Sequence, residues 1–148
     1  MARSEWTSLS RALWQAENAT DQALDVAMLP LGLSTSLFGT LRLIAANPGR
    51  SAADLARDAG VRPQSTAYAV SRLEELGMVE RRPHPVHGKV MQVFPTRAGD
   101  AALTAGDRIL RSAEKRLTAA FTSDQLRVFH ALLARITENA RQILANQE

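Results

Sequence analysis

Apolar residues recur at helical spacing along most of the chain, beginning near its N-terminus. Residues 4 to 28 carry apolar and small side chains at intervals that suit one face of an amphipathic helix, and the pattern stops at Pro30 and Gly32. A second helical run starts at Ser34 and stops at the breaker cluster Asn47-Pro48-Gly49. The pattern therefore predicts two helices in the first third of the chain.

Two shorter helices are predicted next, separated by a tight turn. Ser51 is placed to cap the first of them, which ends at Gly60. The second begins near Pro63, since proline costs little in a first helical turn, and ends at Gly77, which suits a left-handed C-terminal cap. Its predicted inward stripe consists of Thr66, Ala69, Val70, Leu73 and Leu76. Its outward side repeats Gln64, Tyr68 and Arg72 every four residues.

The segment after Gly77 changes to the short alternating runs typical of strands. Residues Met78 to Arg82 and Val90 to Phe94 indicate a β-hairpin whose connecting loop is polar, partly cationic and loose. The remainder returns to helical spacing.

A long helical segment is predicted from Thr96 to Phe121, with Gly99 and Gly106 as weak points. Thr122 and Gln125 then make a capping-box signature that opens a last helix. Four helices, a hairpin and two further helices give a mainly α (α+β) fold.

Composition suits one compact domain spanning residues 1–148. The chain contains no cysteine, which excludes disulfides, thiolate nucleophiles and cysteine-containing zinc sites. Its longest apolar stretch falls far short of the roughly 18 residues that a membrane span needs, and its start does not resemble a secretory signal. We therefore expect a cytoplasmic protein with no membrane partner.

Positive charge is concentrated in the middle of the chain. Residues 50–97 hold eight Arg or Lys and five Asp or Glu, a net charge of +3, whereas the preceding and following segments carry −1 and +1. A basic central segment is the distribution expected where that segment meets an anionic partner.

The two short helices also match the spacing of a helix-turn-helix. In this pattern Ala56 lets the helices cross closely, Gly60 permits the turn, and the remaining positions fill the interface. Those remaining positions are Leu55, Ala59, Val61, Thr66 and Ala69. The competing interpretation is an ordinary helical hairpin in a bundle, but the hairpin that follows favours a winged helix-turn-helix.

At this point the chain resembles the MarR family of transcriptional regulators. The resemblance rests on Ala53-Asp54-Leu55-Ala56, Gly60-Val61, the run from Arg72 to Arg82, and Pro95-Thr96-Arg97-Ala98-Gly99. It implies an obligate dimer in which residues 34–97 form the winged helix-turn-helix DNA-binding lobe and residues 1–30 and 98–148 supply dimerisation helices. It further implies a homodimeric repressor on a palindromic double-stranded DNA operator, released by a small aromatic or phenolic effector.

Transferring the family roles by position gives a set of DNA-binding candidates. Gln64 is the leading base reader because its amide can pair bidentately with adenine, while Ser65 and Tyr68 can contact base or phosphate. Arg62 and Arg72 resemble phosphate anchors. The wing departs from the family pattern because His87 replaces an acidic residue and Lys89 lacks the planar fork of arginine, which favours backbone contact over minor-groove reading. The complete candidate set is Arg62, Pro63, Gln64, Ser65, Tyr68, Arg72, Arg81, Arg82, His84, His87 and Lys89.

The remaining chemistry is sparse. Candidate walls of an effector pocket are Trp14, Met28, Leu31, Phe38 and Phe121, each of which also suits plain core packing. His84 and His87 make an incomplete metal site, so no metal or other cofactor is expected, although their protonation is a hypothesis for stronger DNA binding at lower pH. No phosphate loop or nucleophile elbow indicates an enzyme. The alternative function is a DNA-binding or partner-binding regulatory protein that responds to no ligand.

Overall fold

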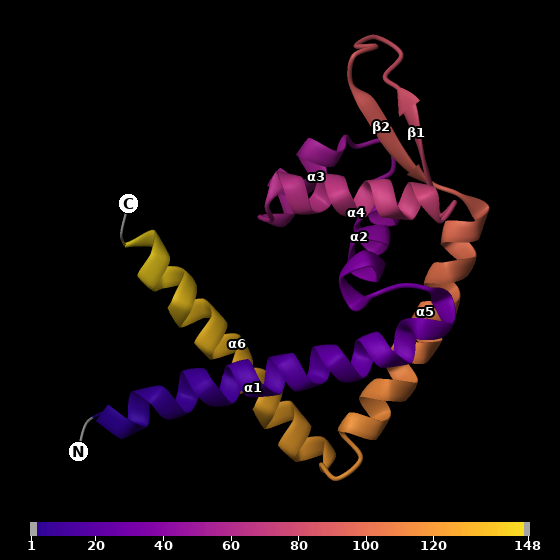
Figure 1. The fold of residues 1–148 in the computed structure, drawn as a ribbon. Coiled ribbons are helices and arrows are strands. Elements are labelled where there is room, and N and C mark those ends of the chain that lie inside the picture. Colours follow the sequence, from indigo (N-terminus) through magenta and orange to yellow (C-terminus); the bar gives the residue numbers. More distant parts are fainter. Residues whose placement is uncertain (1–2, 147–148) are drawn as a thin grey trace. The chain divides into compact units, whose positions relative to one another are not determined.

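A computed structural model describes residues 3–146, with side chains from residue 9 onward, and confirms the mainly helical fold with one small sheet. The elements of Figure 1 are α1 (Arg3–Met28), the short 3-10 helix η1 (Leu29–Leu31), α2 (Thr35–Ala46), α3 (Ala52–Ala59), α4 (Pro63–Glu75), strands β1 (Val79–Pro83) and β2 (Met91–Pro95), α5 (Arg97–Leu117) and α6 (Ser123–Ala145). The first two and last two residues of the predicted terminal segments lie outside the described residues.

The hairpin lies one residue later than predicted. β1 and β2 pair antiparallel from Val79 opposite Pro95 to Pro83 opposite Met91, so each strand ends in a proline that the edges of a two-stranded sheet tolerate. A short stretch before α3, which the sequence pattern did not predict, runs beside β2. There the Gly49 amide donates to the Val93 carbonyl at 2.9 Å, and the Val93 amide donates to the Arg50 carbonyl at 3.0 Å.

The chain forms two compact units, residues 1–113 and residues 114–148. The first unit has one hydrophobic core, to which α1, α2, α3, α4, the hairpin and α5 all contribute. Its buried members are Met28, Leu33, Phe38, Leu41, Ile44, Leu55, Val70, Leu73, Val79, Val93 and Ala102. This core holds the α3–α4 pair and the hairpin against one another.

Two glycines let α5 approach its neighbours closely. A Cβ placed on Gly106 would lie 2.2 Å from the ring of Phe38, and one on Gly99 would lie 2.1 Å from the carbonyl oxygen of Met78. The expectation that these glycines are weak points was wrong, because α5 continues through both and uses the missing side chain for packing.

Thr96 connects the start of α5 to the end of α4. Its hydroxyl donates to the carbonyl of Gly77 at 2.6 Å and accepts the amide of Gly99 at 3.1 Å. The motif Pro95-Thr96-Arg97-Ala98-Gly99 therefore has a structural role: it joins the outgoing strand of the hairpin to the helix that follows.

The second unit contains the end of α5 and α6. The predicted capping box is confirmed, since the Thr122 amide donates to Gln125 Oε1 at 2.9 Å and the Gln125 amide donates to Thr122 Oγ1 at 3.2 Å. The preceding helix stops at Leu117 instead of Phe121, because residues 118–121 form turns. None of the described residues of α6 is fully buried, and Phe129 and Ile143 are more than half exposed.

We compared the length and hydropathy of the helices with those that a membrane span requires. Within residues 3–146 no single helix is long and apolar enough to cross a bilayer. Only the bent pair Leu9–Leu31 and Thr35–Ala46 has the required length and hydropathy, when its two parts are taken together.

Candidate nucleic-acid interface

The crossing of α3 and α4 forms the base of the site. Leu55 and Ala56 of α3 and Ala69 of α4 are all buried, as expected where the two helices of a helix-turn-helix pack together. The prediction that Ala59 and Val61 fill this interface was wrong, because both are exposed. The reason is the turn itself: Gly60 adopts φ 65°, and the Val61 amide donates to the Ala56 carbonyl at 3.0 Å, which closes the helix end.

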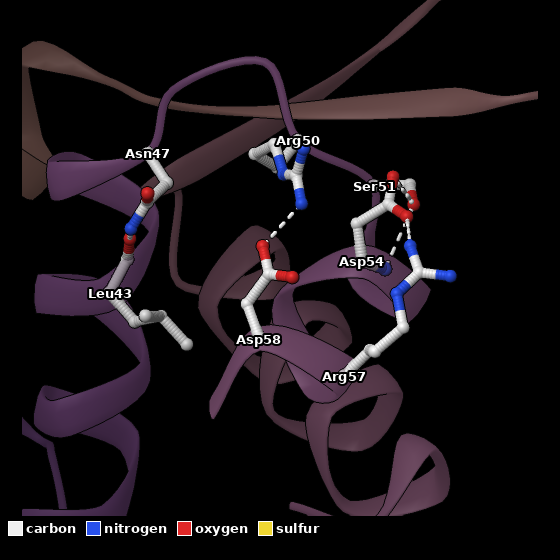
Figure 2. A network of polar contacts seen from close by, with 7 residues as sticks. All are labelled: Leu43, Asn47, Arg50, Ser51, Asp54, Arg57 and Asp58. Atoms are coloured by element: carbon white, nitrogen blue, oxygen red, sulfur yellow. Dashed lines mark hydrogen bonds and ion pairs between the residues drawn. The ribbon is translucent and has the colours of Figure 1, made fainter. Parts of the chain in front are cut away.

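A polar network fixes the start of α3, as Figure 2 shows. The predicted cap is confirmed, since the Ser51 hydroxyl accepts the Asp54 amide at 3.1 Å and also donates to the Asp54 carboxylate at 2.8 Å. Arg57 pairs with Asp54, and Arg50 pairs with Asp58. The pKa of Asp54 is lowered, chiefly by the Ser51 hydroxyl and secondarily by the nearby arginines. Two cations of the basic segment are thus already neutralised.

The second helix, α4, presents one apolar and one polar face. Its apolar face is buried through Thr66, Ala69, Val70 and Leu73, as predicted, whereas Leu76 is partly exposed.

The outward face of α4 is open to solvent. Gln64, Ser65 and Tyr68 are exposed, and with Ser34 and Ser36 near the start of α2 they line a shallow groove of about 580 Å³. Leu37 and Ala69 also line the groove, so its surface is mostly apolar, and its hydroxyl, amide and phenol groups can form hydrogen bonds without a formal charge. The two α2 serines were missed by sequence reasoning, since no local spacing relates them to α4.

The arginines that follow are engaged by acidic side chains. Arg72 pairs with Glu75 one turn along α4. Arg82 pairs with Glu80 and lies over the ring of Phe94, with 4.8 Å from its guanidinium carbon to the ring centroid.

Arg81 is directed back toward α4 instead of away from the protein. Its guanidinium donates to Glu74 at 2.8 Å and to Ser71 at 3.0 Å. Sequence reasoning missed both partners, although Ser71 and Glu74 are three residues apart and so share one side of the helix.

Hydrogen bonds within the loop shape the wing tip. The Nδ1 atom of His84 accepts the amides of Val86 and His87, both at 3.1 Å, and the two imidazole rings lie 5.2 Å apart. The His84 amide also donates to the Val90 carbonyl at 2.8 Å.

Two of the DNA-binding candidates keep their positive charge unpaired. Within residues 9–146, Arg62 and Lys89 have no ion-pair partner, and both are exposed. Arg62 precedes Pro63, the first residue of α4, and makes no side-chain cap to it. These two cations stand at the start of the outward-facing helix and near the tip of the hairpin.

The effector candidates are distributed over both units. Met28 and Phe38 are buried in the core of the first unit, and Leu31 packs against that core. Trp14 and Phe121 are 63% and 54% exposed. Phe121 borders a shallow apolar hollow of about 410 Å³ on the second unit, together with Val128, Phe129 and Leu132. Among the described residues no group of three or more His, Cys, Asp or Glu could hold a metal ion.

The fold is that of a winged helix-turn-helix protein. It has a buried crossing of α3 and α4, a polar outward face on α4, and a hairpin that extends beyond both helices (Figure 1). A MarR family model matches residues 31–89. The HTH-type transcriptional repressor Rv2887 of Mycobacterium tuberculosis is 33% identical over 113 residues, which cover 76% of this chain and 81% of that repressor. The chain belongs to the MarR family of winged-helix regulators.

Solved structures agree with this assignment. A crystal structure of Rv2887 from Mycobacterium tuberculosis in complex with p-aminosalicylic acid has a TM-score of 0.69 and 29% identity, covering 87% of this chain and 98% of that one. The transcriptional repressor CouR bound to a 23-mer DNA duplex has a TM-score of 0.81 and 25% identity, with coverage of 90% and 96%.

Proposed function

We propose that this protein is a homodimeric repressor that binds a palindromic double-stranded DNA operator and is released by a small aromatic or phenolic effector. The observation that carries the proposal is the exposed polar face of α4, where Gln64, Ser65 and Tyr68 project from a helix whose other face is buried. A helix of this kind enters the major groove in winged helix-turn-helix proteins. The relative CouR, bound to a DNA duplex, supports the same mode for residues 34–97.

The exposed side chains of α4 supply the sequence reading. Gln64 pairs bidentately with an adenine edge, Tyr68 contacts a thymine methyl or a phosphate, and Ser65 hydrogen-bonds base or phosphate. Pro63 starts the helix at the groove.

The unpaired cations supply the phosphate contacts. Arg62 and Lys89 can bind phosphates directly because neither is paired with a carboxylate within residues 9–146. Arg72 and Arg82 reach phosphates only by exchanging Glu75 and Glu80. His84 and His87 hold the wing tip beside the DNA backbone.

Dimerisation through residues 1–30 and 98–148 is supported by apolar side chains that the single chain leaves exposed. Trp14 and Val26 of α1 are more than 60% exposed, and so are Ile143 and Leu144 of α6. Large apolar side chains left exposed along amphipathic helices favour a protein–protein interface over a solvent-facing role. A dimer places two α4 helices on one face of the duplex and multiplies a weak single-lobe affinity.

The effector is supported by the Rv2887 structure, which holds p-aminosalicylic acid. A small aromatic acid is accordingly the class that we propose for this chain, and a cytoplasmic location follows from a DNA-binding role. The competing proposal, ligand-independent regulation, predicts that such an acid does not release the protein from DNA.

Selection of duplexes from a random pool tests the proposal. We expect enrichment of a palindrome with half-sites about one helical turn apart, or a multiple of it. The Gln64→Ala variant should relax the preference at one base pair of each half-site by about 1–3 kcal/mol. As its matched control, Lys89→Gln should weaken binding to all sequences alike and lower the salt slope by about 0.9 per protomer.

Two results would contradict the proposal. Absence of any enriched duplex would remove sequence-specific binding. Unchanged affinity for the selected duplex in millimolar p-aminosalicylate would remove this aromatic acid as an effector and favour the ligand-independent alternative.

A further inference from the structure

Arg81 joins the hairpin to two successive turns of α4. One guanidinium nitrogen, Nη1, lies 2.8 Å from Glu74 Oε2, and Nη2 lies 3.0 Å from Ser71 Oγ. The Arg81 side chain is 29% exposed and that of Glu74 is 38% exposed. The guanidinium fork thus makes two directed hydrogen bonds in a partly shielded position.

The position of Arg81 in β1 explains why it is turned inward. Side chains alternate along a strand, so Arg81 shares a sheet face with Val79, which is buried in the core. Arg82, one residue later, lies on the opposite face and is exposed. Neighbouring arginines of one strand therefore meet different surroundings.

We propose that Arg81 is a positioning residue for DNA reading, which holds the hairpin at a fixed angle to α4 through Glu74 and Ser71 instead of contacting a phosphate. This inference rests on the proposed function. With the angle held, the outward face of α4 and the wing tip meet neighbouring parts of one duplex together, and less ordering is required on binding.

The charges around Arg81 favour this role over direct contact. To reach a phosphate, Arg81 would have to leave both partners, and the Glu74 carboxylate would then remain uncompensated close to the DNA phosphates. Arg62 and Lys89 face no such competition within residues 9–146.

Affinity and salt dependence on the duplex selected by the wild-type protein separate the two roles. Arg81→Lys keeps the charge but cannot span Glu74 and Ser71, so it should bind about two- to fivefold more weakly with an unchanged salt slope. Ser71→Ala changes no charge and should weaken binding in the same direction. Arg81→Gln should also leave the slope unchanged, whereas the control Lys89→Gln should lower it by about 0.9 per protomer.

A readout without DNA tests the connection itself. Amide hydrogen exchange of the free protein should become faster in residues 79–83 and in the last turns of α4 in Arg81→Gln, but not in Arg82→Gln. Because this measurement needs no operator, it still tests the connection between the hairpin and α4 if the proposed DNA-binding function is wrong.

Three results would overturn the positioning role. The first is a loss of about 0.9 per protomer in the salt slope of Arg81→Gln, which would make Arg81 a phosphate contact. The second is wild-type affinity in Arg81→Lys and Ser71→Ala. The third is unchanged hydrogen exchange in Arg81→Gln.

Discussion

Replacing Gly106 with alanine tests the close packing of α5 against α2. A Cβ at this position would lie 2.2, 2.7 and 2.9 Å from the Cε2, Cζ and Cδ2 atoms of Phe38. Carbon atoms in proteins pack at about 3.5–4.0 Å, so either the ring or the helix must move by roughly an ångström. Phe38 is only 2% exposed, so its ring cannot move aside without displacing the residues that cover it.

The expected effect is the difference between two terms. Overpacking of a core costs about 1–3 kcal/mol, whereas alanine gains up to about 1 kcal/mol over glycine in a helix interior. We therefore expect the Gly106→Ala variant to lose about 1–2 kcal/mol of unfolding free energy. That loss corresponds to a fall in Tm of roughly 2–8 °C for a chain of this size.

Gly39 provides a matched control. It lies inside α2, and a Cβ placed on it would meet nothing within 4 Å. Gly39→Ala should therefore gain up to about 1 kcal/mol. Urea unfolding followed by circular dichroism, at one fixed protomer concentration, measures both variants, since a dimer makes stability depend on concentration. Equal stabilisation by the two substitutions would refute the packing argument.

Two further predictions concern the joint between α1 and α2 and the surface of α6. The pKa of Asp25 is lowered because the Thr35 hydroxyl and amide donate to its carboxylate at 2.6 and 2.7 Å. The wild-type protein should therefore be more stable than the Asp25→Asn variant by under about 1 kcal/mol, an advantage present above about pH 4 and lost as the pH falls below it. Urea unfolding that gives one constant stability difference from about pH 7 to about pH 3 would contradict this. Phe129→Glu should shift the protein toward monomer in sedimentation experiments, whereas Arg127→Glu on the same helix should not, and equal masses for both variants would remove α6 from the interface.

Short-range sequence patterns predicted the helices and strands better than they predicted the contacts between them. The caps at Ser51 and Thr122 were predictable because each involves a partner three residues away. Gly106 was misread because its partner, Phe38, lies on a different helix, and helix propensity registers only the cost of glycine. Val61 was misread because a hydrophobic residue after a turn can point outward when the backbone alone closes the helix end.

The candidate site shows the same division. Helical periodicity correctly separated the buried side of α4 from the side that carries Gln64 and Tyr68. The same periodicity places Glu75 within reach of Arg72, three residues away on α4. It carried no information on the partners of Arg81, because those depend on how the hairpin folds back onto α4. Charge counting alone therefore overstated the number of cations free to meet DNA.

This pairing bounds how strongly salt should affect binding. Five of the eight cations in residues 50–97 have carboxylate partners within residues 9–146, which leaves Arg62 and Lys89 as the unpaired cations among the DNA-binding candidates. If only these two bind phosphates, the slope of log affinity against log salt should be about −1.8 per protomer, or about −3.6 for a dimer. If Arg72 and Arg82 also left Glu75 and Glu80 to bind phosphates, the slope of log affinity against log salt for a dimer would double to about −7. A slope near the smaller value would mean that the lobe binds with its internal ion pairs intact, so that specificity rests on the neutral face of α4 and on the simultaneous use of two lobes.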